Sequence, residues 1–346
     1  MIRVLVVDDS PTARALLVQI LGSDPGIQVV GEACDGVEAV ALAQRLRPDV
    51  VTMDIQMAGM DGFEATKEIM IETPTPIVVV TGGLDNREVS VSMLALRAGA
   101  MCVLQKPPGP GGPGHAREIQ QVLETVKAMS QVKVVRHKRP APRDAARPAP
   151  VAARNGQRRA VAIAASTGGP AILHHLLSTL PADFSAPILV VQHMTAGFTP
   201  GLVTHLNASS SLRVKVAEAG DGLVPQTVYL APDERHLGVS DRDTIALSSA
   251  PPVGGFRPSA TFLFESVACA FGPGTVAVIL SGMGQDGVAG LRAVKEAGGR
   301  TVAQDEETSV VFGMPGAAVA AGLADQVLPR DALAAALVKL VSGGAS

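Results

Sequence analysis

The sequence predicts an α/β protein of two domains, each built on a mainly parallel β-sheet. Short apolar runs alternate along the chain with segments in which apolar residues recur at helical spacing. One basic, proline-rich stretch interrupts this alternation near the middle of the chain. A length of 346 residues with 47% hydrophobic content suffices for two ordinary cores. We therefore expect domains over residues 1–125 and 159–346, joined by a linker over residues 126–158.

The N-terminal part shows the pattern of a five-stranded sheet that is doubly wound, with helices on both faces. Its first predicted helix has a clear beginning, because Ser10 can cap it and Pro11 suits the first helical position. The expected strands cover residues 2–7, 27–33, 50–54, 77–81 and 101–106.

Polar side chains stand at the carboxyl ends of several of these strands, where doubly wound sheets bind their ligands. Asp8 and Asp9 follow the first strand, and Asp54 lies at the end of the third. Three converging carboxylates would repel one another unless a cation held them, and oxygen ligands point to Mg²⁺. Thr81 and Lys106 reach the same edge, where they offer the hydroxyl and the positive charge that an added phosphoryl group needs.

A basic segment separates the two predicted domains. Residues 132–159 hold nine lysines and arginines against one aspartate, a net charge of +8, which leaves −11 for the rest of a chain whose total is −3. Four prolines among alanines extend such a segment, so that it buries almost no surface. We interpret it as a solvated linker that complements the acidic domains, in preference to a site that binds DNA.

The C-terminal part resumes the alternation and predicts a second, parallel-rich α/β domain. Its first strand ends in a tight glycine turn that begins a helix and carries Ser166. This serine could be a nucleophile, part of a phosphate cradle or only a helix cap, and the turn alone does not decide. The expected strands cover residues 160–165, 187–192, 213–217, 227–231, 275–281 and 301–304.

Three residues of complementary chemistry follow strands of this second sheet. Ser166 follows the first strand and His193 the second, and Asp286 lies in the glycine-rich turn after the strand over 275–281. An imidazole can take the proton of a serine, while a buried carboxylate fixes the imidazole tautomer and stabilises its cation. We expect a Ser-His-Asp triad, with backbone amides of the glycine-rich turn as an oxyanion hole. Among the other histidines, His236 is an alternative that could line a substrate cleft.

Several other classes of protein are disfavoured. The chain order of serine, histidine and aspartate differs from that of α/β-hydrolases, and Gly168-Gly169 lacks the third glycine of a dinucleotide fingerprint. Three dispersed cysteines suit neither a disulfide framework nor a zinc cluster, and 3% aromatic residues offer little for stacking on bases. Because there is no apolar run of about 20 residues and no signal-peptide pattern, we expect a cytoplasmic protein without membrane insertion or nucleic-acid binding.

The N-terminal motifs are Val6-Val7-Asp8-Asp9-Ser10, Met53-Asp54-Ile55-Gln56-Met57 followed by Met60-Asp61-Gly62, and Lys106-Pro107. Together they resemble the receiver domain of two-component response regulators, which has a flavodoxin-like fold. The resemblance implies that Asp54 accepts a phosphoryl group from a chemotaxis histidine kinase. It also implies that Asp8 and Asp9 hold Mg²⁺ together with Asp54, and that Thr81 and Lys106 contact the acyl phosphate.

The C-terminal motifs are Ala165-Ser166-Thr167-Gly168-Gly169-Pro170, Gln192-His193-Met194, Ala231-Pro232 with Arg235-His236, Arg257-Pro258-Ser259, and Gly282-Met283-Gly284-Gln285-Asp286-Gly287. In this order they resemble the Rossmann-like catalytic domain of chemotaxis protein-glutamate methylesterases, the CheB family. The resemblance implies that Ser166 is the nucleophile, His193 the base and Asp286 the orienting acid. It also implies that the main-chain amide of Met283 stabilises the oxyanion.

The family resemblance implies an enzyme whose activity is switched on by phosphorylation. Its expected substrates are glutamate methyl esters of methyl-accepting chemoreceptors, some members also deamidate receptor glutamines, and the ester hydrolysis needs no cofactor. Phe256 and Thr261 depart from the family pattern, at positions where we expect contacts with the substrate rather than with the triad. Two alternatives stay open: a phosphorylation-controlled binding module in which Ser166 only caps a helix, and the same hydrolase in a chemosensory pathway other than chemotaxis.

Overall fold

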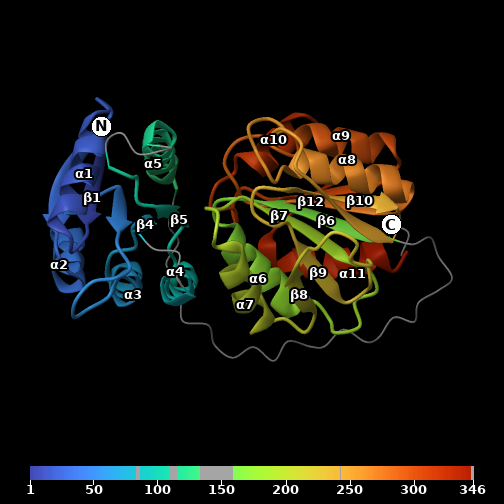
Figure 1. The fold of residues 1–346 in the computed structure, drawn as a ribbon, viewed down its shortest axis with the longest axis horizontal. Helices are drawn as coiled ribbons and strands as arrows, with labels where there is room; N and C mark the ends of the chain where they lie inside the picture. The colour runs from blue at the N-terminus through green and yellow to red at the C-terminus, as the bar shows by residue number, and fades with distance from the viewer. Residues whose placement is uncertain (83–85, 110–114, 133–158, 242, 344–346) are drawn as a thin grey trace. The chain divides into compact units, whose positions relative to one another are not determined.

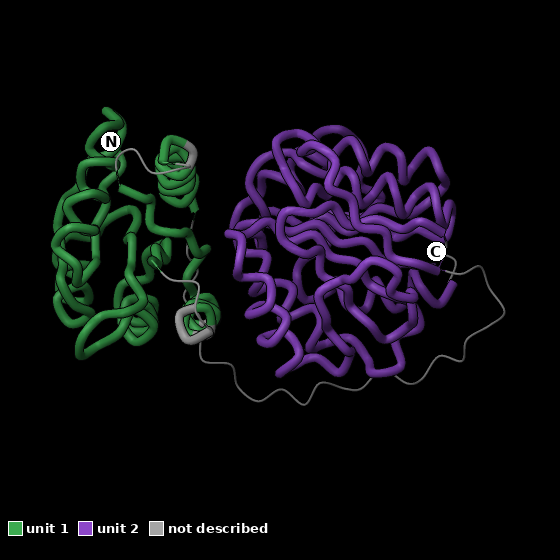
Figure 2. Tube along the Cα trace, in the orientation of Figure 1, with its two compact units in different colours: residues 1–143 green, residues 144–346 purple. Residues whose placement is uncertain are grey.

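The structure is a computed structural model that describes residues 1–82, 86–109, 115–132, 159–241 and 243–343. The chain divides into two compact units, Met1–Arg143 and Asp144–Ser346 (Figure 2). Residues 133–158, which make up most of the predicted linker, lie outside the described residues. In the described parts of the chain, no helix combines the length and the apolar character needed to cross a bilayer.

The first unit contains a five-stranded sheet in the order β2-β1-β3-β4-β5 with every pair parallel, which confirms the doubly wound fold (Figure 1). Helix α1 contacts α5, whereas α2 contacts α3 and α3 contacts α4. The strands are β1 (Ile2–Val7), β2 (Ile27–Ala33), β3 (Val50–Met53), β4 (Ile77–Thr81) and β5 (Cys102–Gln105). The helices are α1 (Pro11–Gly22), α2 (Gly36–Leu46), α3 (Gly62–Glu72), α4 (Asn86–Ala98) and α5 (His115–Met129).

The first helix begins where the sequence predicts. The hydroxyl of Ser10 accepts a hydrogen bond from the backbone N–H of Ala13 at 3.4 Å, and Pro11 is the first helical residue. Leu17, Ile20 and Leu21 are the buried residues of α1. The strand β1 therefore runs straight into a capped helix, which leaves Asp8 and Asp9 in the short turn between them.

The second unit contains a seven-stranded sheet in the order β14-β13-β12-β6-β7-β9-β8. Every pairing in it is parallel, which confirms the second α/β domain (Figure 1). The strands are β6 (Ala160–Ala165), β7 (Ile188–Gln192), β8 (Arg213–Val216), β9 (Thr227–Leu230), β12 (Thr275–Ile279), β13 (Arg300–Gln304) and β14 (Gln326–Leu328). The helices are α6 (Gly169–Thr179), α7 (Thr199–Asn207), α8 (Ala260–Phe271), α9 (Val288–Glu296), α10 (Met314–Ala320) and α11 (Leu333–Val341).

An antiparallel hairpin of β10 (His236–Asp241) and β11 (Thr244–Ser248) adds a two-stranded sheet that the sequence analysis does not anticipate. Its buried apolar residues are few, since Leu237, Val239 and Ile245 alternate with glycine, serine or more exposed positions. Such a short alternation is a weak strand signal. The hairpin contacts α8, and it therefore forms part of the support of that helix.

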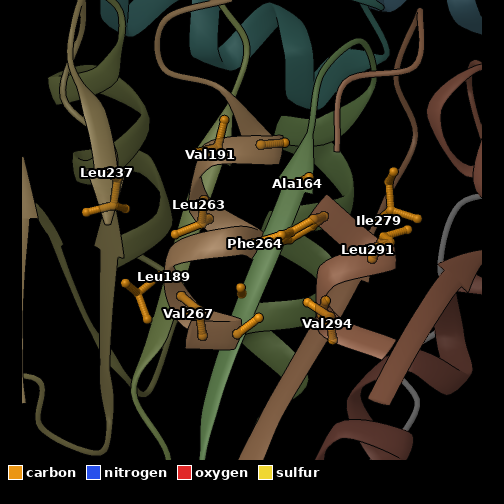
Figure 3. Packing of buried hydrophobic residues seen from close by; sticks show 14 of the residues in the cluster. Ala164, Leu189, Val191, Leu237, Leu263, Phe264, Val267, Ile279, Leu291 and Val294 are labelled. Atoms are coloured by element: carbon orange, nitrogen blue, oxygen red, sulfur yellow. The ribbon is translucent and has the colours of Figure 1, made fainter. Parts of the chain in front are cut away.

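Helix α8 packs into the core of the second unit, against β6, β12, α9 and β10. Figure 3 shows Phe264 and Val267 of this helix among side chains from the sheet and from α9. Phe264 is fully buried, and burying a side chain of this size stabilises the fold by roughly 1.5–3 kcal/mol. This packing fixes α8 along its length, so that its first turn is held at one defined place.

Candidate active site

Ser166 directly follows β6, the central strand of the second sheet. Its backbone N–H donates to the carbonyl of Ser281 at 3.0 Å, and β12 ends two residues before Ser281. The chain then turns through Gly168, whose φ of +79° suits glycine, and enters α6. Ser166 is partly exposed and lies at the carboxyl edge of the sheet.

His193 follows the neighbouring strand and lies beside Ser166. The register of β6 and β7 pairs Ala165 with Gln192, and the backbone N–H of His193 donates to the carbonyl of Ala165 at 2.8 Å. Adjacent strands lie about 4.8 Å apart, which brings the next residues on each chain within reach of one another. In the described chain the Ser166 hydroxyl forms no hydrogen bond to the ring, and such bonds often form only once a substrate binds.

Asp286 is buried and completes this cluster. Its Oδ2 atom lies 3.0 Å from Nε2 of His193, and the side chains of these residues are 2% and 10% exposed, respectively. The ring N–H does not point straight at the oxygen, so the contact is an ion-pair distance rather than a well-aligned hydrogen bond. Nε2 faces the carboxylate, and Nδ1 is buried without a hydrogen-bond partner among the residues that the structure describes.

The carboxylate of Asp286 sits on the first turn of α8. It accepts hydrogen bonds from the backbone N–H groups of Ala260 at 2.7 Å and Thr261 at 3.1 Å, and from the hydroxyl of Ser259 at 2.9 Å. The N-terminus of a helix favours negative charge. Burial alone would raise the pKa of Asp286, but the contact with His193 and these amides lower it to about 2. The carboxylate therefore stays ionised next to the imidazole.

The glycine-rich turn after β12 carries the predicted oxyanion donor. Gly282 is anchored on both sides, since its N–H donates to Val311 at 3.0 Å and its carbonyl accepts from Met314 at 2.8 Å. The N–H of Met283 donates to no acceptor among the residues that the structure describes. Met283 is 37% exposed, and the residue before it, Gly282, packs so closely on Ser166 that a Cβ atom at 282 would lie 2.7 Å from the Cβ atom of Ser166.

Two positions that we expected to contact the substrate rather than the triad, Phe256 and Thr261, lie against the predicted triad. The ring of Phe256 stacks on His193 with centroids 4.4 Å apart. Thr261 donates its N–H to Asp286, and its hydroxyl accepts from the N–H of Gly287 at 2.9 Å. The expectation that these positions avoid the triad was wrong, because the chain from Phe256 to Thr261 leads into the first turn of α8, which binds the carboxylate of Asp286.

His236, the alternative histidine, is fully buried and has a structural role. Its Nδ1 accepts a hydrogen bond from the N–H of Ser259 at 3.2 Å, so Nε2 carries the proton that faces the carbonyl of Pro251 at 3.2 Å. Ser259 was not predicted as a partner of Asp286. The available signal was its place just before an apolar helix, where a serine serves as a cap, and it does cap α8.

The first unit has a separate acidic cluster at the carboxyl edge of its sheet. Ligand atoms of Asp8, Asp9 and Asp54 lie within 4.8 Å of one another, and Nζ of Lys106 lies 2.8 Å from both Asp8 and Asp54. Thr81 ends β4, and its carbonyl accepts from the N–H of Lys106 at 2.8 Å. All five residues predicted for this site therefore belong to one edge of the sheet.

The electrostatics of this cluster suit a hard cation. Burial raises the pKa of Asp54, although the hydrogen bond and charge of Lys106 oppose the shift. Burial opposes the charge of Lys106, but Asp54 and Asp8 outweigh it and raise the pKa of the lysine. Three carboxylates balanced by one lysine still carry excess negative charge, and carboxylate oxygens are the ligands that Mg²⁺ prefers. The residues present therefore fit Mg²⁺.

Comparisons with known proteins agree with this division into two sites. A family model described as CheB methylesterase matches residues 161–337, and one described as response regulator receiver domain matches residues 4–111. A protein-glutamate methylesterase/protein-glutamine glutaminase of Myxococcus xanthus is 56% identical over 99% of this chain and 98% of its own length. One from Anaeromyxobacter dehalogenans is 56% identical over 96% and 97%, respectively.

One solved structure resembles the second unit. The CheB methylesterase catalytic domain of Thermotoga maritima is 41% identical, with a TM-score of 0.53, and covers 54% of this chain and all of that domain. The similarity in sequence and fold thus extends over the sheet whose edge carries Ser166, His193 and Asp286.

Proposed function

Because the chain belongs to the CheB methylesterase family and carries a response regulator receiver domain, we propose that it is a phosphorylation-activated hydrolase of glutamate methyl esters in chemoreceptors. Relatives at 56% identity over nearly the whole chain bear the name protein-glutamate methylesterase/protein-glutamine glutaminase. The proposed site is the edge of the second sheet, and the proposed place of action is the cytoplasm, where the receptor helices and the kinase are accessible.

The chemistry uses Ser166, His193 and Asp286 as a triad. The Oγ atom of Ser166 attacks the ester carbonyl while Nδ1 of His193 takes its proton, and the N–H of Met283 donates to the oxyanion. His193 then passes the proton to the leaving methoxide, so methanol departs and an acyl-enzyme remains. Water attacks this ester while His193 takes one of its protons, and His193 then returns that proton to Oγ of Ser166 as the acyl bond breaks. The glutamic acid released loses its remaining proton to solvent and becomes a carboxylate.

The observation that carries this proposal is the way in which Asp286 is held. Two backbone amides and a hydroxyl at the start of α8 bind this carboxylate and keep it ionised. The carboxylate also contacts His193, which follows β7, the strand beside the one that leads to Ser166. A helix cap alone would need neither the histidine nor the carboxylate. Deamidation of receptor glutamines follows the same steps with ammonia as the leaving group.

The receiver domain supplies the proposed regulation. Asp54 would accept a phosphoryl group from a histidine kinase, while Asp8, Asp9 and Asp54 would hold Mg²⁺ and Thr81 and Lys106 would contact the phosphoryl oxygens. The bound cation supplies positive charge against the phosphoryl oxygens during transfer. Phosphorylation need change an equilibrium between an inhibited and an open arrangement by only a few kcal/mol to raise activity strongly.

The decisive experiment measures methanol release from membranes that bear methylated chemoreceptors, with and without a small phosphodonor. Ser166→Ala is expected to abolish release and to leave phosphorylation of Asp54 intact. Ser178→Ala is the matched control, because this exposed serine of α6 bonds only a carbonyl of its own helix. Methanol release that persists in Ser166→Ala would contradict the proposal. If the phosphodonor does not raise the rate of methanol release by the parent protein, only the proposed regulation by phosphorylation is contradicted.

A further inference from the structure

The side chain of Gln192 lies between two residues of the proposed active site. Gln192 is the last residue of β7 and is 7% exposed. Its Nε2 atom donates one hydrogen bond to the carbonyl of Ser166 and another to the carbonyl of His193, each at 2.8 Å. Both partners are acceptors, so the nitrogen of the amide must face them, which settles the orientation of the group.

These two hydrogen bonds lie just beyond the last backbone hydrogen bond between β6 and β7. The last backbone bond between β6 and β7 runs from the N–H of His193 to the carbonyl of Ala165. Beyond it the chains separate, because Ser166 turns into α6 and His193 enters the loop that leads to α7. The Gln192 amide therefore extends the connection between the strands by one step, at the two residues that must exchange a proton.

Gly169 leaves room for this amide. A side chain at residue 169 would overlap Oε1 of Gln192 and would lie 2.8 Å from the Cβ atom of Ala165. Gly169 is the first residue of α6, where alanine would otherwise favour the helix by up to about 1 kcal/mol. The glycine is therefore explained by the close approach of the Gln192 amide.

Stability alone does not account for a glutamine at this position. Oε1 of Gln192 is buried and has no hydrogen-bond partner among the described residues. A buried acceptor without a partner typically costs about 1–3 kcal/mol, which offsets much of what two neutral hydrogen bonds contribute. An apolar side chain of similar length would avoid this cost but would remove both hydrogen bonds, so the amide contributes little net free energy to folding.

We infer that Gln192 is a positioning residue that holds Ser166 and His193 at the separation required for proton transfer. The inference rests on the proposed function, since it concerns the same nucleophile and base. Proton transfer needs the two side-chain atoms within roughly 2.6–3.2 Å, and a misplacement of about 1 Å can lower a rate by about a hundredfold. The carbonyl and the side chain of a residue share one Cα, so an amide that holds both carbonyls also holds the two Cα–Cβ bonds from which the Ser166 and His193 side chains extend.

The test compares Gln192→Met with the parent in the full-length protein. Methionine has a similar length but donates no hydrogen bond. We expect kcat for methanol release, and the rate at which a small fluorophosphonate labels Ser166, to fall by roughly ten- to a hundredfold, with KM within about twofold because the substrate surface is unchanged. A variant with an unchanged labelling rate would overturn the inference. Labelling that persists in Ser166→Ala would instead overturn the proposed function.

Thr301→Val is the matched control for loss of buried hydrogen bonds. Thr301 is fully buried near the start of β13, at the opposite edge of the sheet. Its hydroxyl donates to the carbonyl of Leu323 at 2.6 Å and accepts from the N–H of Asp325 at 3.0 Å. We expect this variant to lower Tm at least as much as Gln192→Met while it labels at the parent rate. Equal slowing of both variants at equal loss of Tm would mean that general destabilisation explains the effect, and would overturn the inference.

Gly169→Ala provides a second and independent perturbation, because it displaces the amide without removing it. If both changes act through the same group, the double variant is expected to be no slower than the slower single variant. Rate losses that multiply in the double variant would show that the two positions act separately, and would contradict the role of the amide.

Discussion

The ring of Phe256 stacks on the ring of His193 with centroids 4.4 Å apart and planes 13° from parallel. One face of the imidazole is therefore covered by an apolar ring, and its Nε2 edge is taken up by Asp286 at 3.0 Å. Together these contacts leave the ring few orientations other than the one in which Nε2 faces Asp286. The proposed base is held by packing as well as by charge.

Replacement of Phe256 by alanine is expected to lower kcat/KM for methanol release by about two- to tenfold. The stacked pair is worth about 0.5–1.5 kcal/mol, and without it the imidazole gains rotational freedom. Phe256→Tyr keeps the ring and is expected to retain the parent rate. Steady-state kinetics of the two variants, with Tm recorded for each, provide the comparison. Equal rates for the alanine and tyrosine variants would show that the stack does not orient the base.

The lowered pKa of Asp286 predicts a specific loss of stability in acid. The pKa of about 2 in the folded protein lies below the ordinary value of 3.8, so the unfolded chain binds this proton more readily. The resulting stabilisation is complete above about pH 5 and is lost as the pH falls towards 2, an effect of about 2 kcal/mol. Urea denaturation of the parent and of Asp286→Asn at pH 5 and pH 2 measures it. The parent and Asp286→Asn should differ more in unfolding free energy at pH 5 than at pH 2. An equal difference at both pH values would show that these contacts do not lower the pKa of Asp286.

Phosphorylation of the first unit is expected to depend on Asp54 and on a divalent cation. Asp54→Asn should take up no phosphoryl group from acetyl phosphate, and the parent should take up none when EDTA removes Mg²⁺. Asp49→Asn is the matched control, because Asp49 precedes β3 at the opposite edge of the sheet, whereas Asp54 follows it. Incorporation of labelled phosphate is the readout. Uptake in Asp54→Asn equal to that in the parent would place the phosphoacceptor elsewhere.

Gly282 is expected to tolerate no side chain. A Cβ atom there would lie 2.7 Å from the Cβ atom of Ser166 and would also overlap the sulfur of Met314. Gly282→Ala should therefore displace Ser166 or the turn that carries Met283, and should lower methanol release more than tenfold. Gly22→Ala is the control, because a Cβ atom at this helix end meets nothing within 4 Å. Comparable activity of the two variants would show that the turn around Gly282 can shift without loss of catalysis.

The sequence predicted the inner strands of both sheets because strands such as β3, β4, β6, β7 and β12 are buried along their whole length and read as apolar runs. The short edge strand β14, which is only partly buried, was not predicted. Strands β1, β2, β4 and β6 begin and end at the expected residues. The sites followed from one rule, that ligands gather at the carboxyl ends of parallel strands. That rule placed Ser166 and His193 side by side, and it gathered Asp8, Asp54 and Lys106.

Contacts that depend on the chain far from a strand end could not be predicted in this way. The partners of Asp286 belong to Ser259, Ala260 and Thr261, which follow an irregular stretch and a hairpin with a weak pattern. Composition and spacing do not reveal that the first turn of α8 lies next to the glycine-rich turn that follows β12. For the same reason Phe256 could be assigned to the substrate side, although it packs on His193.

The support of Asp286 by α8 ties the proposed reaction to the integrity of the core. The helix whose first turn binds the carboxylate also carries Phe264 and Val267 into the centre of the second unit. Loosening of that core would release the acid from the base before any catalytic side chain is altered. Heat inactivation should therefore be as cooperative as unfolding itself, with no folded but inactive intermediate. A substitution of a core residue such as Phe264 would lower activity even though the residue takes no part in the reaction.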